Sequence, residues 1–363
     1  VDIMKRELTA LLIIRCMVLT LLCGCAPEAP DGSGETVSIT DCAGRTVEVP
    51  KDPRSICCIC PFSGAMIVMF GFGDRLTTSC NNMVRSRLLT NICPAIADTV
   101  VVKNSGSVNA ETVLEKKTDL IFVNDGTYET DDERAKLDAL GIPYVVVGFT
   151  DLAGQMEAMM VIGRALGAED KAQSYVDWCR GVYADVQEKL EGADTASVRL
   201  YHAVNEATRT DYRGSICAEW IAMTGVTNVS LDGELSMEND KAYVSLEQVY
   251  SWAPQMMICN EPGVDEYIMS DGQWAGLECV LSGRVYQMPV GISRMGHPTS
   301  TETPLALIWL ANILCPELYP VDYPQVLKDY YRDFYGYELD DETVQAIISA
   351  EDMRAEKTNS SVE

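Results

Sequence analysis

The segment Val108-Asn-Ala-Glu-Thr-Val113 returns later in the chain as Val244-Ser-Leu-Glu-Gln-Val249. At the same spacing, the apolar run Leu120-Ile-Phe122 returns as Met256-Met-Ile258. Each copy predicts a helix with a Glu in its first turn, followed by a buried strand. Because the helix dipole favours Glu in the first turn of any helix, the helix start alone could match by chance. The joint match of helix and strand indicates that the two halves of the chain are copies of one unit.

Both copies end their strand with the same polar residue, Asn124 in the first half and Asn260 in the second. Apolar strands separated by helices are predicted throughout both halves, at residues 55–60, 120–123, 144–147, 197–201, 255–259 and 284–288. This alternation predicts parallel sheets that are covered on both faces. The expected fold class is α/β, with two Rossmann-like lobes and a ligand cleft between them, since ligands bind beyond the carboxyl ends of parallel strands.

Residues 151–192 contain no Pro and only isolated Gly, which predicts a single long linker helix, broken near Gly167. This linker sets the expected domain boundaries. They are a lipoprotein signal peptide (1–24), a flexible tether (25–35), an N-terminal α/β lobe (36–150), the linker helix (151–192), a C-terminal α/β lobe (193–354) and a polar tail (355–363).

The beginning of the chain has the pattern of an export signal. Lys5 and Arg6 precede an apolar stretch that is short and interrupted at Arg15, so it is poorly suited to span a bilayer. The stretch ends in Leu22-Cys-Gly-Cys25, which resembles the bacterial lipobox and thereby implies a lipid on Cys25. A simply secreted chain and an uncleaved anchor are the alternatives. We expect an extracytoplasmic protein of the cell envelope, tethered to the membrane by its N-terminal lipid.

The chain is strongly acidic, with 54 Asp and Glu against 28 Lys and Arg and a formal charge of −26. Such a charge repels the phosphates of nucleic acids, so we exclude them as partners. Many of the 14 cysteines lie within or beside apolar runs, where a free Cys behaves as a small hydrophobe. One or two disulfides, or a thiolate metal site, are the alternatives to buried thiols.

Several stretches of the chain match a known pattern, at residues 41–50, 52–76, 108–121, 283–286 and 309–319. Together they resemble the iron-siderophore, heme and cobalamin family of periplasmic binding proteins, the class III solute-binding proteins of ABC importers. In the third stretch, Thr118 replaces a proline that is usual in the family. The resemblance covers the chain from about residue 36 to 336.

The resemblance implies a receptor with no intrinsic cofactor that is not an enzyme. Its implied ligand is a metal chelate such as an iron-siderophore; heme or a cobamide are alternatives, as is a receptor for a free metal ion or oxyanion. The implied partners are an ABC permease dimer and its ATPase, and we expect the receptor to act as a monomer. Glu111 and Glu247 match the carboxylates at the lobe tips that dock onto permease arginines, although they could be ordinary helix-start acids.

Motifs for catalysis are missing from the sequence. Gly71-Phe-Gly73 lacks the third glycine of a dinucleotide-binding turn, and there is no phosphate-binding Gly-Lys-Ser/Thr loop and no nucleophile elbow. Two histidines are also too few for a receptor of bare zinc or manganese.

Candidate ligand-binding residues come from the predicted strand ends and the loops that follow them: Phe62, Ser63, Ser105, Asn124, Tyr212, Arg213, Asn260, Arg294, Met295 and His297. Arg213 and Arg294 matter most, because a planar guanidinium binds carboxylate and catecholate groups well, although either could form a surface ion pair. His297 could contact a metal or an anion, and nearby Met295 makes heme ligation conceivable; a plain loop histidine is the alternative. His202 follows a strand and could equally lie in the core.

Overall fold

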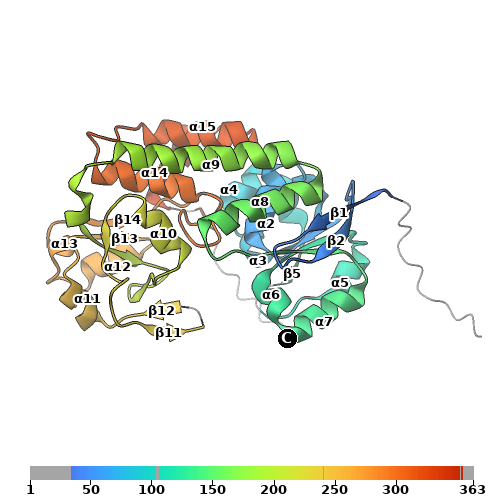
Figure 1. Ribbon diagram of the computed structural model, residues 1–363, viewed down its shortest axis with the longest axis horizontal. Helices are drawn as coiled ribbons and strands as arrows, with labels where there is room; N and C mark the ends of the chain where they lie inside the picture. The colour runs from blue at the N-terminus through green and yellow to red at the C-terminus, as the bar shows by residue number, and fades with distance from the viewer. Residues whose placement is uncertain (1–33, 104–105, 240, 352, 355–363) are drawn as a thin grey trace, which may run out of the picture. The chain divides into compact units, whose positions relative to one another are not determined.

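The computed structural model describes residues 34–103, 106–239, 241–351 and 353–354 (Figure 1). The predicted export signal, the lipidation site Cys25, most of the tether, the candidate Ser105 and the tail 355–363 lie outside the described residues. From Thr36 onward, the described residues belong to one structural unit.

An antiparallel hairpin opens the described chain. It consists of β1 (Thr36–Thr40) and β2 (Thr46–Pro50). The Asp41 carboxylate accepts two backbone N–H groups of the turn and pairs with Arg45 at 2.7 Å. The same carboxylate accepts the N–H of Val146 at 3.1 Å, so one buried acid both closes the turn and attaches the hairpin to the first sheet.

The first lobe is built on a five-stranded parallel sheet in the order β5-β4-β3-β6-β7. The strands are β3 (Ile56–Cys58), β4 (Leu76–Cys80), β5 (Val100–Lys103), β6 (Leu120–Asn124) and β7 (Tyr144–Val147). The chain moves outward from β3 through β4 to β5 and then restarts at β6 on the other side of β3. The order therefore reverses between β3 and β6, which is where open α/β sheets bind ligands beyond their carboxyl ends.

Short helices connect these strands: α2 (Pro61–Met69), α3 (Asn81–Val84), α4 (Arg87–Ile92), α5 (Ala110–Glu115), α6 (Asp125–Glu129) and α7 (Asp131–Leu140), with single 3₁₀ turns at Gly73–Arg75 and Pro94–Asp98. α2 begins with a proline, whose missing N–H would be unsatisfied there in any case, and the rest of the helix is buried. Gly64 allows α2 to lie close to α3, because a Cβ at this position would overlap the side chain of Met83.

The second lobe repeats this plan with a four-stranded parallel sheet in the order β10-β8-β13-β14. The strands are β8 (Arg199–Ala203), β10 (Thr227–Asn228), β13 (Met256–Cys259) and β14 (Val285–Gln287). Here the order reverses between β8 and β13. The helices are α10 (Ile216–Ala222), α11 (Leu246–Trp252), α12 (Val264–Ser270) and α13 (Glu278–Leu281), with a 3₁₀ turn at Asp194–Ser197.

A small antiparallel sheet, which the sequence did not predict, is added to the second lobe. Its order is β11-β12-β9, formed by β11 (Ser236–Glu238), β12 (Lys241–Tyr243) and β9 (Arg209–Thr210). It brings Arg209 and the residues after it beside the carboxyl end of β8.

The linker is broken at Gly167, as predicted, but the two parts pack against each other and do not form one long helix. It is two helices, α8 (Leu152–Leu166) and α9 (Glu169–Lys189), separated at Gly167, which adopts a left-handed conformation with φ +63°. The α8 start reaches the second lobe, where the N–H of Leu152 donates to Glu219 at 2.8 Å. The α9 start contacts the first lobe, where Lys171 donates to the carbonyl of Phe70 at 2.7 Å. The two helices pack against each other, so the lobes are joined by a helical hairpin.

The chain ends in α14 (Thr303–Leu314), α15 (Tyr323–Tyr335) and α16 (Asp341–Ser349), and α9 lies against α14 and α15 (Figure 1). This C-terminal part was predicted to belong to the second lobe alone. It returns to the first lobe, because α15 packs against α2 and the N–H of Arg87 donates to the carbonyl of Met353 at 3.0 Å. One continuous apolar cluster therefore runs from the first lobe through the helical hairpin into the second.

Candidate functional site

The carboxyl ends of the two sheets face a common cleft. A cavity of about 500 Å³, here called the arginine cavity, is lined by residues of both lobes and of the chain end: Asn82, Arg85, Asn205, Glu206, Glu261, Pro262, Val290, Arg294, Ala350, Met353 and Arg354. Asn205 and Glu261 follow β8 and β13 closely, so the cavity lies at the point where the strand order of the second sheet reverses. This is the geometry that the repeated unit predicted.

Three arginines line the arginine cavity, although the chain as a whole is acidic. Arg294 donates to Asn205 Oδ1 at 2.7 Å and forms an ion pair with Glu261, and its side chain is 15% exposed. Arg354 and Arg85 line the same cavity. Burial, followed by the charges of Arg294 and Arg85, lowers the pKa of Arg354. Glu206 and Glu261 also line the cavity, so three guanidinium groups and two carboxylates face it.

Glu302 supports the loop that contains Arg294 from the buried side of the protein. Its buried carboxylate accepts two backbone N–H groups of the loop, at 2.8 and 3.1 Å, and the hydroxyl of Tyr331. Burial raises the pKa of Glu302, and these hydrogen bonds oppose the rise. Glycine is needed at Gly291, because a Cβ there would overlap the Glu302 carboxylate. The Arg294 guanidinium is therefore presented by a loop with few alternative conformations.

A second hollow, of about 690 Å³, extends the cleft toward the small antiparallel sheet. Its lining again comes from both lobes and includes Asp125, Phe149, Arg209, Asp211, Tyr212, Cys217, Lys241 and His297. His297 also borders a small hollow of about 90 Å³ together with Arg294 and Arg354. His297 thus stands between the arginine cavity and the second hollow.

The His297 ring is held in one tautomer by its own loop. The N–H of Thr299 donates to His297 Nδ1 at 3.3 Å, which leaves the ring proton on Nε2. Burial, followed by the charges of Arg294 and Arg209, lowers the pKa of His297 well below its usual value. The imidazole is therefore neutral at neutral pH and can donate one hydrogen bond to an anion.

Comparison with known proteins identifies this architecture. A profile of the periplasmic binding protein family matches residues 75–290. The chain belongs to the periplasmic binding protein family. The prediction of a class III receptor is confirmed by this match and by solved structures that share the fold.

Of two curated relatives of this binding protein, one is named as a molybdate-binding protein and the other as a substrate-binding component of an ABC transporter. The molybdate-binding protein MolA of Haemophilus influenzae is 26% identical over 67% of this chain and 74% of its own length. The ABC transporter substrate-binding lipoprotein YvrC of Bacillus subtilis, which is uncharacterized, is 22% identical over 77% of this chain and 90% of its own length. A solved periplasmic solute-binding protein of Veillonella parvula covers 86% of this chain and 97% of its own, with a TM-score of 0.74 and 22% identity.

This binding protein is accordingly the extracytoplasmic substrate-binding component of an ABC transporter, and it belongs to a family of receptors, not of enzymes. Among the helices that the structure describes, none combines the length and the apolar character that crossing a membrane requires.

The structure brings only some of the predicted ligand residues to the cleft of the binding protein. Arg294, His297 and Tyr212 line it, together with Asp125 and Glu261, which adjoin predicted strand ends. Arg213 does not line the described hollows; its side chain is 69% exposed and pairs with Asp232, so the surface alternative holds for this arginine.

Four other candidates are turned into the protein. Phe62 is buried and packs on Phe149, with the ring centroids 4.7 Å apart, and its neighbour Ser63 is also buried. Asn260 is buried and accepts the N–H of Asn205 at 2.8 Å, so it positions a lining residue. Heme ligation by Met295 is wrong, because its sulfur lies in the core and accepts the hydroxyl of Tyr323 at 3.3 Å.

Asn124 lies at the end of β6, as predicted, but is engaged locally by Thr127, whose hydroxyl lies 2.5 Å from Asn124 Oδ1. Sequence reasoning missed Arg85, Arg209 and Arg354. Arg354 follows the last helix, and Arg209 lies in a two-residue strand, so neither is near a recognisable strand end. The only sequence feature that could have pointed to these three arginines is that basic residues are few in this acidic chain.

The two predicted docking acids occupy equivalent positions in the two lobes. Glu111 lies in the first turn of α5 and Glu247 in the first turn of α11, and both are exposed. Each helix is capped by the residue two places before its acid: Asn109 accepts the N–H of Thr112 at 3.1 Å, and Ser245 caps α11 in the same way. Both helices lead into an interior strand of their sheet, β6 or β13.

Proposed function

We propose that this binding protein captures an anionic metal chelate, such as an iron-siderophore with carboxylate or catecholate groups, and delivers it to an ABC permease. The observation that carries the proposal is the meeting of Arg294, Arg354 and Arg85 in one interlobe cavity of a chain with a formal charge of −26. Guanidinium groups bind carboxylates and related anions in a planar, bidentate way. A cluster of them in an acidic protein selects for negative charge.

The size of the cleft supports a chelate over a small ion. The arginine cavity and the second hollow measure about 500 and 690 Å³, within the range typical of sites for organic ligands. The second hollow adds Phe149 and Tyr212, whose rings can cover an apolar or aromatic part of a ligand. The lining of the second hollow also carries charged groups of both signs, among them Arg209 and Lys241, which could contact further anionic groups of a chelate.

An oxyanion such as molybdate is the second candidate. The specific observation in its favour is the sequence relation to MolA, which is named as molybdate-binding. A tetrahedral anion would need only the arginine cavity and the neutral His297 donor, and it would leave the second hollow to solvent.

Delivery would use the two exposed acids, Glu111 and Glu247, one on each lobe. Two negative charges at matched positions can read the spacing of a symmetric basic surface on a permease dimer. We also propose that the N-terminal lipid is attached at Cys25; the relative YvrC, which is named as a lipoprotein, supports this.

A panel titration of the purified protein tests the ligand. Ferric tricatecholate, ferric citrate, hemin, cobalamin, molybdate and phosphate would each be added while Trp and Tyr fluorescence is recorded. We expect the anionic ferric chelates to bind with micromolar Kd or tighter, about −8 kcal/mol, and cobalamin not to bind. Binding of molybdate alone would replace the chelate by the oxyanion candidate. Binding of neutral cobalamin with no anion bound would overturn the proposal.

A further inference from the structure

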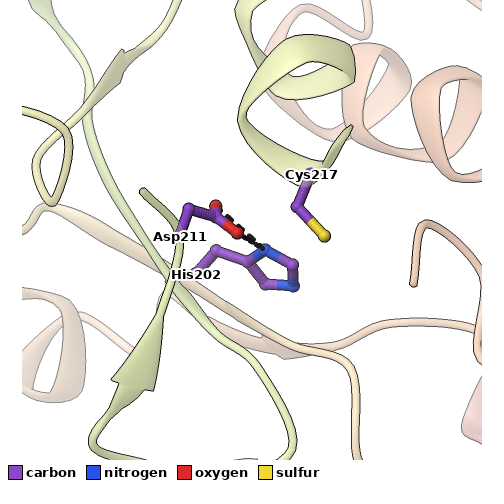
Figure 2. A group of neighbouring side chains, drawn as sticks. All are labelled: His202, Asp211 and Cys217. Atoms are coloured by element: carbon purple, nitrogen blue, oxygen red, sulfur yellow. Dashed lines mark hydrogen bonds and ion pairs between the residues drawn. The ribbon is translucent and has the colours of Figure 1, made fainter. Parts of the chain in front are cut away.

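Three neighbouring side chains, His202, Asp211 and Cys217, form a cluster of possible metal ligands (Figure 2). Two of them line the second hollow, and none lines the arginine cavity. His202 lies on β8, Asp211 directly after β9, and Cys217 in the first turn of α10. One donor atom from each lies within 4.8 Å of the others, and all three residues are buried. Three separate elements of the second lobe therefore converge their donor atoms on one point.

The His202 ring has one nitrogen engaged and one without a partner. Nδ1 lies 3.1 and 3.2 Å from the two carboxylate oxygens of Asp211. Two donor atoms that share one zinc ion, each with a bond of about 2 Å, lie at a similar separation. Nε2 is buried and has no hydrogen-bond partner among the described residues. An ion bound between the ring and the carboxylate would take the lone pair of Nδ1, and the ring proton would then lie on Nε2.

Asp211 and Cys217 are held in place by groups outside the cluster. Asn228 Nδ2 donates to Asp211 Oδ2 at 2.9 Å, and the other end of this amide accepts from Ser230, which fixes its orientation. The Cys217 thiol donates to the carbonyl of Gly296 at 3.3 Å. Burial, reinforced by the charge of Asp211, raises the pKa of the Cys217 thiol well above its usual value, so without an ion the sulfur keeps its proton.

We propose that His202, Asp211 and Cys217 bind one thiophilic divalent ion of the zinc class. Imidazole, carboxylate and thiolate are the donors that Zn²⁺ and its analogue Co²⁺ take in proteins. On binding, the sulfur–hydrogen bond is replaced by a sulfur–metal bond, and one proton per ion is released to solvent with no change of oxidation state. The carboxylate, the thiolate and the dication then sum to zero charge, which removes the penalty for burying an isolated ion.

Asp211 and Cys217 also line the second hollow, so an ion held by them would lie at its wall. Three protein ligands with one open position is the arrangement of zinc sites that bind water or a further ligand. The ion would accordingly lie where it can receive a donor atom from a molecule in the cleft. None of the three residues lines the arginine cavity, so binding of the ion can be tested without any anionic ligand.

Cobalt titration of the reduced full chain, without any chelate, tests the site. We expect one Co²⁺ per chain with a thiolate-to-cobalt charge-transfer band, release of one proton, and competition by Zn²⁺. The Cys217→Ala variant should lose the band, and His202→Gln should weaken binding at least about tenfold. Cys279→Ser, which alters another buried thiol of the second lobe, is the matched control and should keep the band.

Retention of the charge-transfer band in Cys217→Ala, or its loss in Cys279→Ser, would overturn the assignment. So would a wild-type chain that binds no Co²⁺ or Zn²⁺. If the variants do not fold, X-ray absorption of the zinc-loaded wild type decides, because one sulfur ligand with nitrogen and oxygen neighbours is expected. A zinc ion coordinated by oxygen atoms alone, or by several sulfur atoms, would contradict the proposed set of ligands.

Discussion

Replacing Arg294 with Ala removes a guanidinium whose side chain is 15% exposed and which donates to Asn205 and pairs with Glu261. A hydrogen bond to a charged group contributes about 1.5–3 kcal/mol. Since about 1.4 kcal/mol corresponds to a tenfold change in Kd, we expect the affinity for an anionic ligand to fall about 10- to 100-fold. The loop itself should keep its shape, because Glu302 and not Arg294 supports it.

The partner of Arg294 adds to this loss. In the variant, the Glu261 carboxylate remains at the cavity without its arginine and repels the anion. Glu261→Gln in the Arg294→Ala background should therefore restore part of the affinity. Arg294→Lys keeps the charge but not the bidentate fork, so it should bind with intermediate affinity.

The matched control is Arg213→Ala, because Arg213 is 69% exposed and pairs with Asp232 at the surface. Exposed ion pairs contribute little, so its Kd should stay within about twofold of wild type. The assay is fluorescence titration with each anion that binds the wild type, at low and high ionic strength. An Arg294→Ala protein with wild-type affinity for all of these anions would refute the anion site.

Three further outcomes follow from the described contacts. Because the pKa of His297 is held well below its usual value, anion affinity should not change between about pH 6.5 and 8, and it should rise only at lower pH, where the ring gains a proton; titrations across this range check it. Gly291→Ala should lower both the melting temperature and the anion affinity, since the new methyl group overlaps the Glu302 carboxylate; unchanged melting would contradict this. The double variant Glu111→Ala/Glu247→Ala should keep the wild-type Kd in titrations but lose stimulation of the reconstituted transporter ATPase, and full stimulation would remove these acids from the docking surface.

The elements that the sequence predicted well are those whose pattern is set by burial alone. The strands β3, β6, β7 and β13 lie in apolar runs and fall at the predicted ranges. β4 was missed because Thr77, Thr78 and Ser79 interrupt its apolar pattern, although the strand is mostly buried between β3 and β5. The small antiparallel sheet has strands of two or three residues, too short to show a period.

The site was harder to predict, because much of it is assembled by tertiary contacts. Arg294 and His297 were found since they follow β14 within one loop. Arg354 reaches the cavity only because the chain end returns to the first lobe, where it bridges to Ser86. Met295 was assigned to the cleft by its position beside Arg294, but it lies in a turn that directs its side chain into the core.

The continuous apolar cluster that joins both lobes through α9, α14 and α15 has a consequence for transport. A wide opening of the receptor would expose this shared apolar cluster to water. The distance between Glu111 and Glu247 should therefore be nearly the same in the empty and in the ligand-bound protein. A permease that docked on these two acids would bind the ligand-bound and the empty receptor in the same way. Telling them apart would then depend on a slight tilt of one half, or on direct contact with the cargo at the mouth of the cleft.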